Sequence, residues 1–257
     1  MTTIIGIKTT SGSVDAVVMG ADTRRVYYDN HNNLVGNGTC TKFIHREGAP
    51  WIMAYSGWET PHYQRFYREL VGSFKRELQT TMQLDELVEG TRTHFEPVAR
   101  LAMKHRRLTD QISLLLAAGR SGGPGLWSFA EDGTSRELDN GATMTYVSIG
   151  ESEKWAKRIF EQLYVPAALV TFEWAVELIR FVLGFAQGKY TRGYQLAVIT
   201  SRSVELGPRF TGSQDNAWSE YCAATIKKYT GRRSAKEGRR FRNYVVKKDV
   251  FSEIMMR

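Results

Sequence analysis

The sequence predicts an α+β fold in which two antiparallel β-sheets lie between pairs of helices. Strand-like and helix-like runs follow one another in the order strands, two helices, strands, two helices, strands. A fold built from simple βαβ units would instead alternate single strands with single helices. With 257 residues, of which 42% are apolar and 12% aromatic, the chain can fill a substantial core and is not a disordered protein.

The N-terminal quarter is expected to be mainly β-structure. Runs rich in β-branched residues predict strands over residues 3–8, 14–21, 41–45 and 51–55. Residues 25–37, between the second and third runs, are polar and rich in asparagine and glycine, which predicts a long turn or ribbon.

Two pairs of helices are expected, one on each side of the central strands. Apolar residues at spacings of three and four predict helices over residues 60–80 and 85–105, and Pro97 could kink or divide the second. The other pair is expected over residues 153–163 and 171–187. The last of these carries charges at helical spacing, which indicates an amphipathic buried helix and not a membrane span.

The remaining strands are expected in the second half of the chain. They are residues 112–118, 126–130, 143–149, 196–200 and 203–206. The glycine-rich stretch 119–125 is interpreted as a hairpin connection, because no lysine of a phosphate-binding loop follows it. Strands 126–130 and 143–149 are expected to lie around a turn at Asp132.

Cysteine usage and ligand spacing argue against several classes of protein. The two cysteines, Cys40 and Cys222, argue against a disulfide framework and indicate a reducing compartment, so we expect a cytoplasmic protein. The sequence has no Cys-x-x-Cys or His-x-x-x-His spacing, so we expect neither a structural zinc ion nor another cofactor. The apolar start, residues 2–8, is too short for a signal peptide.

Thr2 is the residue on which a catalytic hypothesis can be built. A threonine hydroxyl is a poor nucleophile unless a base takes its proton, and an N-terminal threonine carries its own base, the α-amine. The ordinary pKa of an α-amine lies near working pH, well below that of a lysine amine, which suits a general base. A second residue as small as Thr2 normally permits removal of Met1, so we expect the mature chain to begin at Thr2.

The residues after Thr2 follow a recognisable order. The first strand has the sequence Thr-Thr-Ile-Ile-Gly-Ile and is followed by a turn. An apolar strand comes next and ends in Asp22 and Arg24. Further along, an isolated Lys42 stands before an apolar pair. In this order the chain resembles the proteasome β-subunit and HslV-type peptidase family of N-terminal-nucleophile hydrolases. The resemblance implies a four-layer αββα sandwich over roughly residues 2–206 and cleavage of peptide bonds through an acyl-Thr2 intermediate.

The same resemblance implies a role for each site residue. Thr2 matches the nucleophile, Asp22 the aspartate at the end of the second strand, and Lys42 the lysine beside the nucleophile. Arg24 matches the arginine two residues after that aspartate, and Gly57 the glycine whose N–H forms the oxyanion hole. A buried Lys42 would stay charged only with a partner, for which Asp22 is the candidate, and its charge would favour the deprotonated hydroxyl.

The residues expected around the α-amine depart from the family's pattern. Where the family has a Gly-Ser-Gly turn whose serine touches the amine, this chain has Glu151 in the serine position, followed by Ser152. Thr191 is matched to a later serine, but the aspartate that accompanies that serine has no counterpart. A glutamate beside the amine would raise the pKa of the amine and weaken it as a base.

The excess basic charge is confined to the C-terminal end. Residues 227–257 contain eleven Lys and Arg against three acidic side chains, which accounts for the whole net charge of +8. We therefore divide the chain into a proteasome-like domain, residues 1–226, and a basic extension, residues 227–257. Interleaved aromatic residues favour docking of the extension on a neighbouring subunit over nucleic-acid binding, which is the alternative.

The favoured function is that of a threonine-type endopeptidase that acts on peptide or protein substrates. The resemblance also implies a homo-oligomeric ring and raises the question of an ATPase partner. Two other functions stay open: an amidase or peptide ligase on the same fold, and a non-catalytic scaffold subunit that acts through its basic extension. Removal of Met1 is the first test that separates the catalytic functions from the scaffold, because a chain that retains Met1 has no free Thr2 amine.

Overall fold

The fold is known from a computed structural model of the chain. The structure describes residues 2–9, 15–29, 31, 33–57, 72, 84–104, 112–130, 132, 134–138, 145–150, 153, 156–157, 160, 170–172, 174–176, 178–180, 182–183 and 193–210. The basic extension and most of the helix expected over residues 60–80 lie outside these ranges, so the division of the chain at residue 226 stays a prediction.

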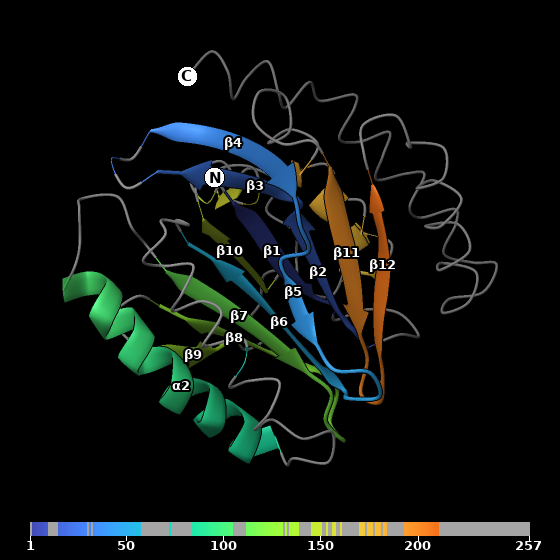
Figure 1. Cartoon of the computed structure of the whole chain (residues 1–257). Helices are drawn as coiled ribbons and strands as arrows, with labels where there is room; N and C mark the ends of the chain where they lie inside the picture. Colours follow the sequence, from blue (N-terminus) through green and yellow to red (C-terminus); the bar gives the residue numbers. More distant parts are fainter. Residues whose placement is uncertain are drawn as a thin grey trace.

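Two five-stranded antiparallel sheets form the centre of the molecule (Figure 1). The first has the strand order β10-β1-β2-β11-β12 and the second the order β5-β6-β7-β8-β9. The strands of the first sheet are β1 (Thr3–Lys8), β2 (Val17–Asp22), β10 (Tyr146–Gly150), β11 (Tyr194–Ile199) and β12 (Val204–Phe210). Those of the second are β5 (Phe43–His45), β6 (Trp51–Ser56), β7 (Ser113–Ala118), β8 (Gly125–Phe129) and β9 (Ser135–Glu137).

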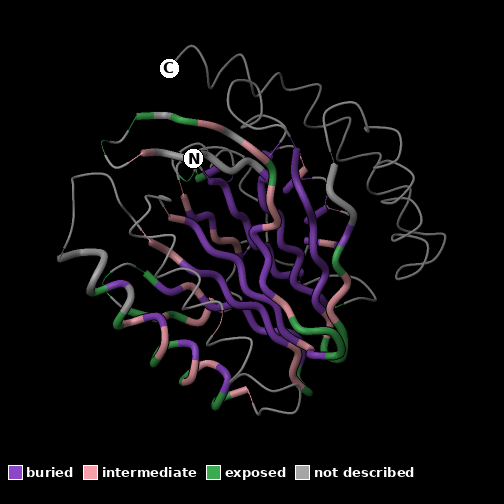
Figure 2. The backbone as a smooth tube through the Cα atoms, in the orientation of Figure 1, coloured by how far each residue is buried: buried purple, intermediate pink, exposed green. Residues whose placement is uncertain are grey.

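The sheets face each other across a buried apolar layer, and most of their strand residues are coloured as buried in Figure 2. Successive side chains of a strand point to opposite faces, so each strand contributes alternate residues to this layer. On β1 the contributor is Ile4, on β2 Met19, on β6 Ile52 and on β7 Leu115. The side chains between them, such as Ile5 and Met53, face outward to the helices.

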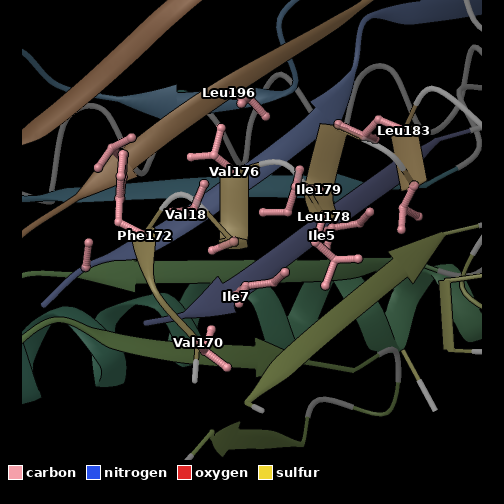
Figure 3. Packing of buried hydrophobic residues seen from close by; sticks show 14 of the residues in the cluster. Ile5, Ile7, Val18, Val170, Phe172, Val176, Leu178, Ile179, Leu183 and Leu196 are labelled. Atoms are coloured by element: carbon pink, nitrogen blue, oxygen red, sulfur yellow. The ribbon is translucent and has the colours of Figure 1, made fainter. Parts of the chain in front are cut away.

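Helical segments cover the outer faces of both sheets and complete the four layers. The helix α2 (Leu84–Lys104) lies on the second sheet, and its Phe95 ring packs edge to face against Phe129 at 6.1 Å between centroids. Helical residues between Phe172 and Leu183 pack on the first sheet, where they surround Ile5, Ile7 and Val18 (Figure 3). The predicted α+β fold, an αββα sandwich, is therefore confirmed.

A two-stranded ribbon, β3 (Arg24–Tyr28) and β4 (Leu34–Thr39), occupies the polar stretch between β2 and β5. Its turn is held by Asp29, whose carboxylate accepts hydrogen bonds from the side chain of Asn33 and from the backbone N–H groups of Asn33 and His31. These bonds, that of the Asn33 side chain first, lower the pKa of Asp29. Asparagine and aspartate favour such turns because their side chains replace backbone hydrogen-bond partners.

Two expectations from the sequence need correction. Pro97 does not divide its helix, because α2 runs unbroken from Leu84 to Lys104. The turn at Asp132 does not lead to the strand expected over 143–149. It leads to the short β9, which pairs with β8, whereas β10 crosses to the other sheet and pairs with β1. The Ser-Arg-Glu sequence of β9 has no apolar residue, so no local pattern marked it as a strand.

Candidate active site

Several strands end or begin at one edge of the sandwich and bring the predicted site residues to the same region. Thr2 directly precedes β1, which lies between β2 and β10. Because these neighbours run antiparallel to β1, their C-terminal ends meet its beginning. The residues at this edge are Thr2, Asp22, Lys42, Ser56, Gly57 and Gly150.

Asp22 fixes the beginning of β1. Its Oδ1 accepts a hydrogen bond of 2.6 Å from the backbone N–H of Thr3, directly across the strand pair. The side chain is 1% exposed, so this carboxylate is held away from bulk water. A buried carboxylate needs such donors, since an uncompensated charge would be costly. Asp22 therefore holds the backbone next to Thr2 in a defined position.

The segment before Lys42 is tied to the first sheet by a series of hydrogen bonds. Thr23 donates its N–H to the carbonyl of Gly193 at 3.0 Å and accepts the N–H of Cys40 at 2.8 Å. The Thr41 hydroxyl donates to Gln195 Oε1 at 2.8 Å. Since Gln195 lies opposite Ala21 on β2, these bonds bring the residue before Lys42 close to the end of β2.

Lys42 is a buried lysine, with 4% of its surface exposed. Its Nζ lies 6.0 Å from the centroid of the Tyr55 ring, within the range of a cation–π contact. Within the described part of the chain, the structure records no ion pair between Lys42 and Asp22, the partner expected from the sequence. The two charged groups reach the same edge of the sandwich on different strands.

Gly150 brings the end of β10 against the chain terminus and against the second sheet. Its φ is +94°, a conformation that L side chains rarely adopt. A Cβ built on Gly150 would lie 2.0 Å from the carbonyl oxygen of Thr2 and 2.7 Å from Ser56 Oγ. These two oxygens therefore lie within 4.7 Å of each other, on the side of Gly150 that a side chain would occupy.

We expect Gly150→Ala to disrupt this arrangement. The added methyl group would collide with the Thr2 backbone, which cannot move aside as a flexible side chain could. The free energy of unfolding should fall by about 2 kcal/mol or more in a denaturant titration, from strain and collision together.

The matched control is Gly48→Ala. Gly48 also has a positive φ, +77°, but a Cβ built there meets nothing within 4 Å. This variant carries the backbone strain without the collision, so it should lose only about 1 kcal/mol. Equal losses in the two variants would contradict the close approach of Gly150 to Thr2.

The other predicted site residues are described only in part. Gly57 follows β6 directly and is half-buried. Arg24 begins β3, of which only the backbone is described. Glu151, Ser152 and Thr191 lie outside the described residues, so their placement around the amine stays a prediction. No role was predicted for Ser56 or Gly150 from the sequence, where the only local signal is a glycine directly after a predicted strand.

No protein-family model and no curated protein matches the chain. Among solved structures, it is similar to an Anbu (Gly-1) mutant from Hyphomicrobium sp. strain MC1, with a TM-score of 0.62 and 13% identity over 89% of this chain and 97% of that one. It is also similar to Anbu (ancestral beta-subunit) from Yersinia bercovieri, with a TM-score of 0.61 and 15% identity over 90% and 99%. The chain has the fold of Anbu proteins. A further Anbu structure, from Hyphomicrobium sp. strain MC1, has a TM-score of 0.58 and 14% identity over 88% of this chain and 97% of that chain.

These findings correct the family assignment made from the sequence. No family model of the proteasome β-subunit or HslV-type peptidases matches the chain, and the solved structures named above are Anbu proteins, which are proteasome-like and have the N-terminal-nucleophile fold. The assignment was wrong because it rested on a short N-terminal motif. At 13–15% identity, the likeness to Anbu shows a shared fold.

Neither a metal-binding cluster nor a membrane-spanning helix is found among the residues that the structure describes. Among them, no three His, Cys, Asp or Glu side chains are grouped so that they could hold a metal ion. No helix within the same residues is long and apolar enough to cross a membrane.

Proposed function

We propose that this protein is an N-terminal-nucleophile hydrolase that cleaves peptide bonds with Thr2. The proposal rests on one observation: Thr2, the buried Asp22 and the buried Lys42 lie at the same edge of the sandwich. Asp and Lys are rarely fully buried, so two such side chains at the strand ends next to a terminal threonine favour a chemical role. The fold shared with the Anbu proteins, one of which is described as an ancestral beta-subunit, supports it.

In the proposed reaction, removal of Met1 frees the α-amine of Thr2. The amine takes the proton of the Thr2 hydroxyl, and Oγ1 attacks the carbonyl carbon of the substrate. The N–H of Gly57 stabilises the oxyanion, a contribution of about 2.7–4 kcal/mol in other enzymes. The protonated amine returns its proton to the leaving amine, and water then hydrolyses the acyl-Thr2 ester.

Asp22 and Lys42 have separate tasks in this reaction. Asp22 holds the backbone of Thr3 and so fixes the position of Thr2. Lys42, whose ammonium has the Tyr55 ring as its partner in place of Asp22, supplies a positive charge in a site from which water is largely excluded. A charge acts more strongly there than in bulk solvent. That charge favours the deprotonated form of the Thr2 hydroxyl.

The proposal is tested by intact mass spectrometry followed by labelling. The expressed protein should lack Met1, because only then is the Thr2 amine free. A peptide epoxyketone should then form a covalent adduct at Thr2, since its ketone takes the hydroxyl and its epoxide takes the amine. Quantitative retention of Met1, or a mature chain that takes no label, would contradict the proposal.

We also propose that copies of the chain assemble with one another. Support comes from the similar protein of Yersinia bercovieri, which is described as an ancestral beta-subunit. Labelling of Thr2 tests only the proposed cleavage of peptide bonds. Self-assembly and a separate role of residues 227–257 are proposals that do not depend on its result.

A further inference from the structure

Ser56 is a largely buried residue whose hydroxyl lies near the beginning of β1. It ends β6, and its side chain, which is 5% exposed, points into the layer between the sheets, because its neighbour Tyr55 faces outward and Ala54 inward. Within the described part of the chain, the structure records no hydrogen bond made by Ser56 Oγ. Its hydroxyl is therefore open to a group that comes close to the end of β6.

Ser56 Oγ lies at the chain terminus that maturation would alter. It is within 4.7 Å of the Thr2 carbonyl oxygen, and both atoms border the space that a side chain at Gly150 would fill. The Thr2 side chain points into the same layer, because it alternates with Thr3 and therefore lies on the face of Ile4.

The direction of the Thr2 amine follows from the strand pairing. In an antiparallel sheet, the N–H and C=O of one residue face the same neighbouring strand. Lys8 donates its N–H to Thr145 beside β10, whereas Thr9 and Thr3 donate theirs to Ala16 and Asp22 on the β2 side. Even-numbered residues of β1 therefore face β10. The nitrogen of Thr2 points to that side, as its carbonyl oxygen does.

We propose that Ser56 is a positioning residue for the Thr2 amine, an inference that rests on the proposed function. When Met1 is removed, Ser56 Oγ accepts a hydrogen bond from the new amine. One N–H of the amine is then fixed, and its lone pair is directed toward the Thr2 hydroxyl, whose proton it takes. Ser56 itself forms no covalent bond to substrate.

The experiment compares the kinetics of peptide epoxyketone labelling in matched variants. Ser56→Ala removes the hydroxyl. Ser148→Ala is the control. It removes a buried hydroxyl that has no hydrogen-bond partner among the described residues, but this hydroxyl belongs to β10 and lies on the outward face with Ile5. Ser56→Thr keeps a hydroxyl. Intact mass confirms removal of Met1 in each, and thermal midpoints confirm folding.

Ser56→Ala should lower the labelling rate at saturating epoxyketone by roughly three- to tenfold, the effect of one hydrogen bond. The half-saturating concentration should stay within about twofold of wild type, because the inhibitor is bound as before. Ser148→Ala should match wild type, and Ser56→Thr should recover most of the rate.

Other outcomes would overturn the role of Ser56. A wild-type rate in Ser56→Ala, an equal loss in Ser148→Ala, or a change in half-saturation alone would do so while the proposed function stands. A mature wild-type chain that takes no label would overturn the proposed function and the role of Ser56 together.

Discussion

Thr2→Ala is expected to abolish covalent labelling by a peptide epoxyketone. Alanine is as compatible with removal of Met1 as threonine is, so the variant keeps a free α-amine at the same position. The substitution removes the hydroxyl, the only group proposed to attack the carbonyl carbon. Intact mass should show a mature chain with no added mass under conditions that label the wild type completely.

Thr2→Ser is the matched control for this result. It keeps both the hydroxyl and the amine and removes one methyl group, so labelling should persist. The thermal midpoints of the two variants should lie close together, because each loses few buried atoms at the end of a strand. An adduct that survives in Thr2→Ala would point to another nucleophile.

The strands and helices with regular patterns could be predicted from the sequence. The β-branched run of β1 and the apolar spacing of α2 gave the elements Thr3–Lys8 and Leu84–Lys104 within one residue. A local pattern carries no information about the sheet that a strand joins. Hence β10 could be expected as a strand but not as the partner of β1, and the short polar β9 was missed.

For the candidate site too, the sequence indicated residues but not the contacts between them. A motif near the N-terminus singled out Thr2, Asp22 and Lys42, and the structure brings all three to one edge. It could not show that Asp22 accepts the Thr3 N–H, or that Gly150 allows Ser56 to approach Thr2. Those contacts join strands that are distant in sequence. The motif is also short, and for that reason it led to the wrong family assignment.

Lys42→Met is expected to slow labelling of Thr2 by a factor on the order of a hundred, with little loss of stability. Methionine fills a similar volume without the charge. Removal of a fixed group that stabilises developing charge costs about 10²–10³ in rate in other enzymes. The unfolding free energy should change little, since Asp22 keeps the Thr3 N–H as its donor and the described residues show no ion pair between Asp22 and Lys42 that the substitution would break.

Lys8→Met is the matched control for the charge at Lys42. Lys8 is also a buried lysine, with 8% of its surface exposed, but it lies at the opposite end of β1 from Thr2. Lys8 follows Thr2 by six positions along an extended strand, which is about 20 Å. Loss of this charge should leave the labelling rate unchanged. A wild-type rate in a folded Lys42→Met protein would exclude Lys42 from the site, and equal slowing in Lys8→Met would mean that the effect comes from the fold and not from a charge beside Thr2.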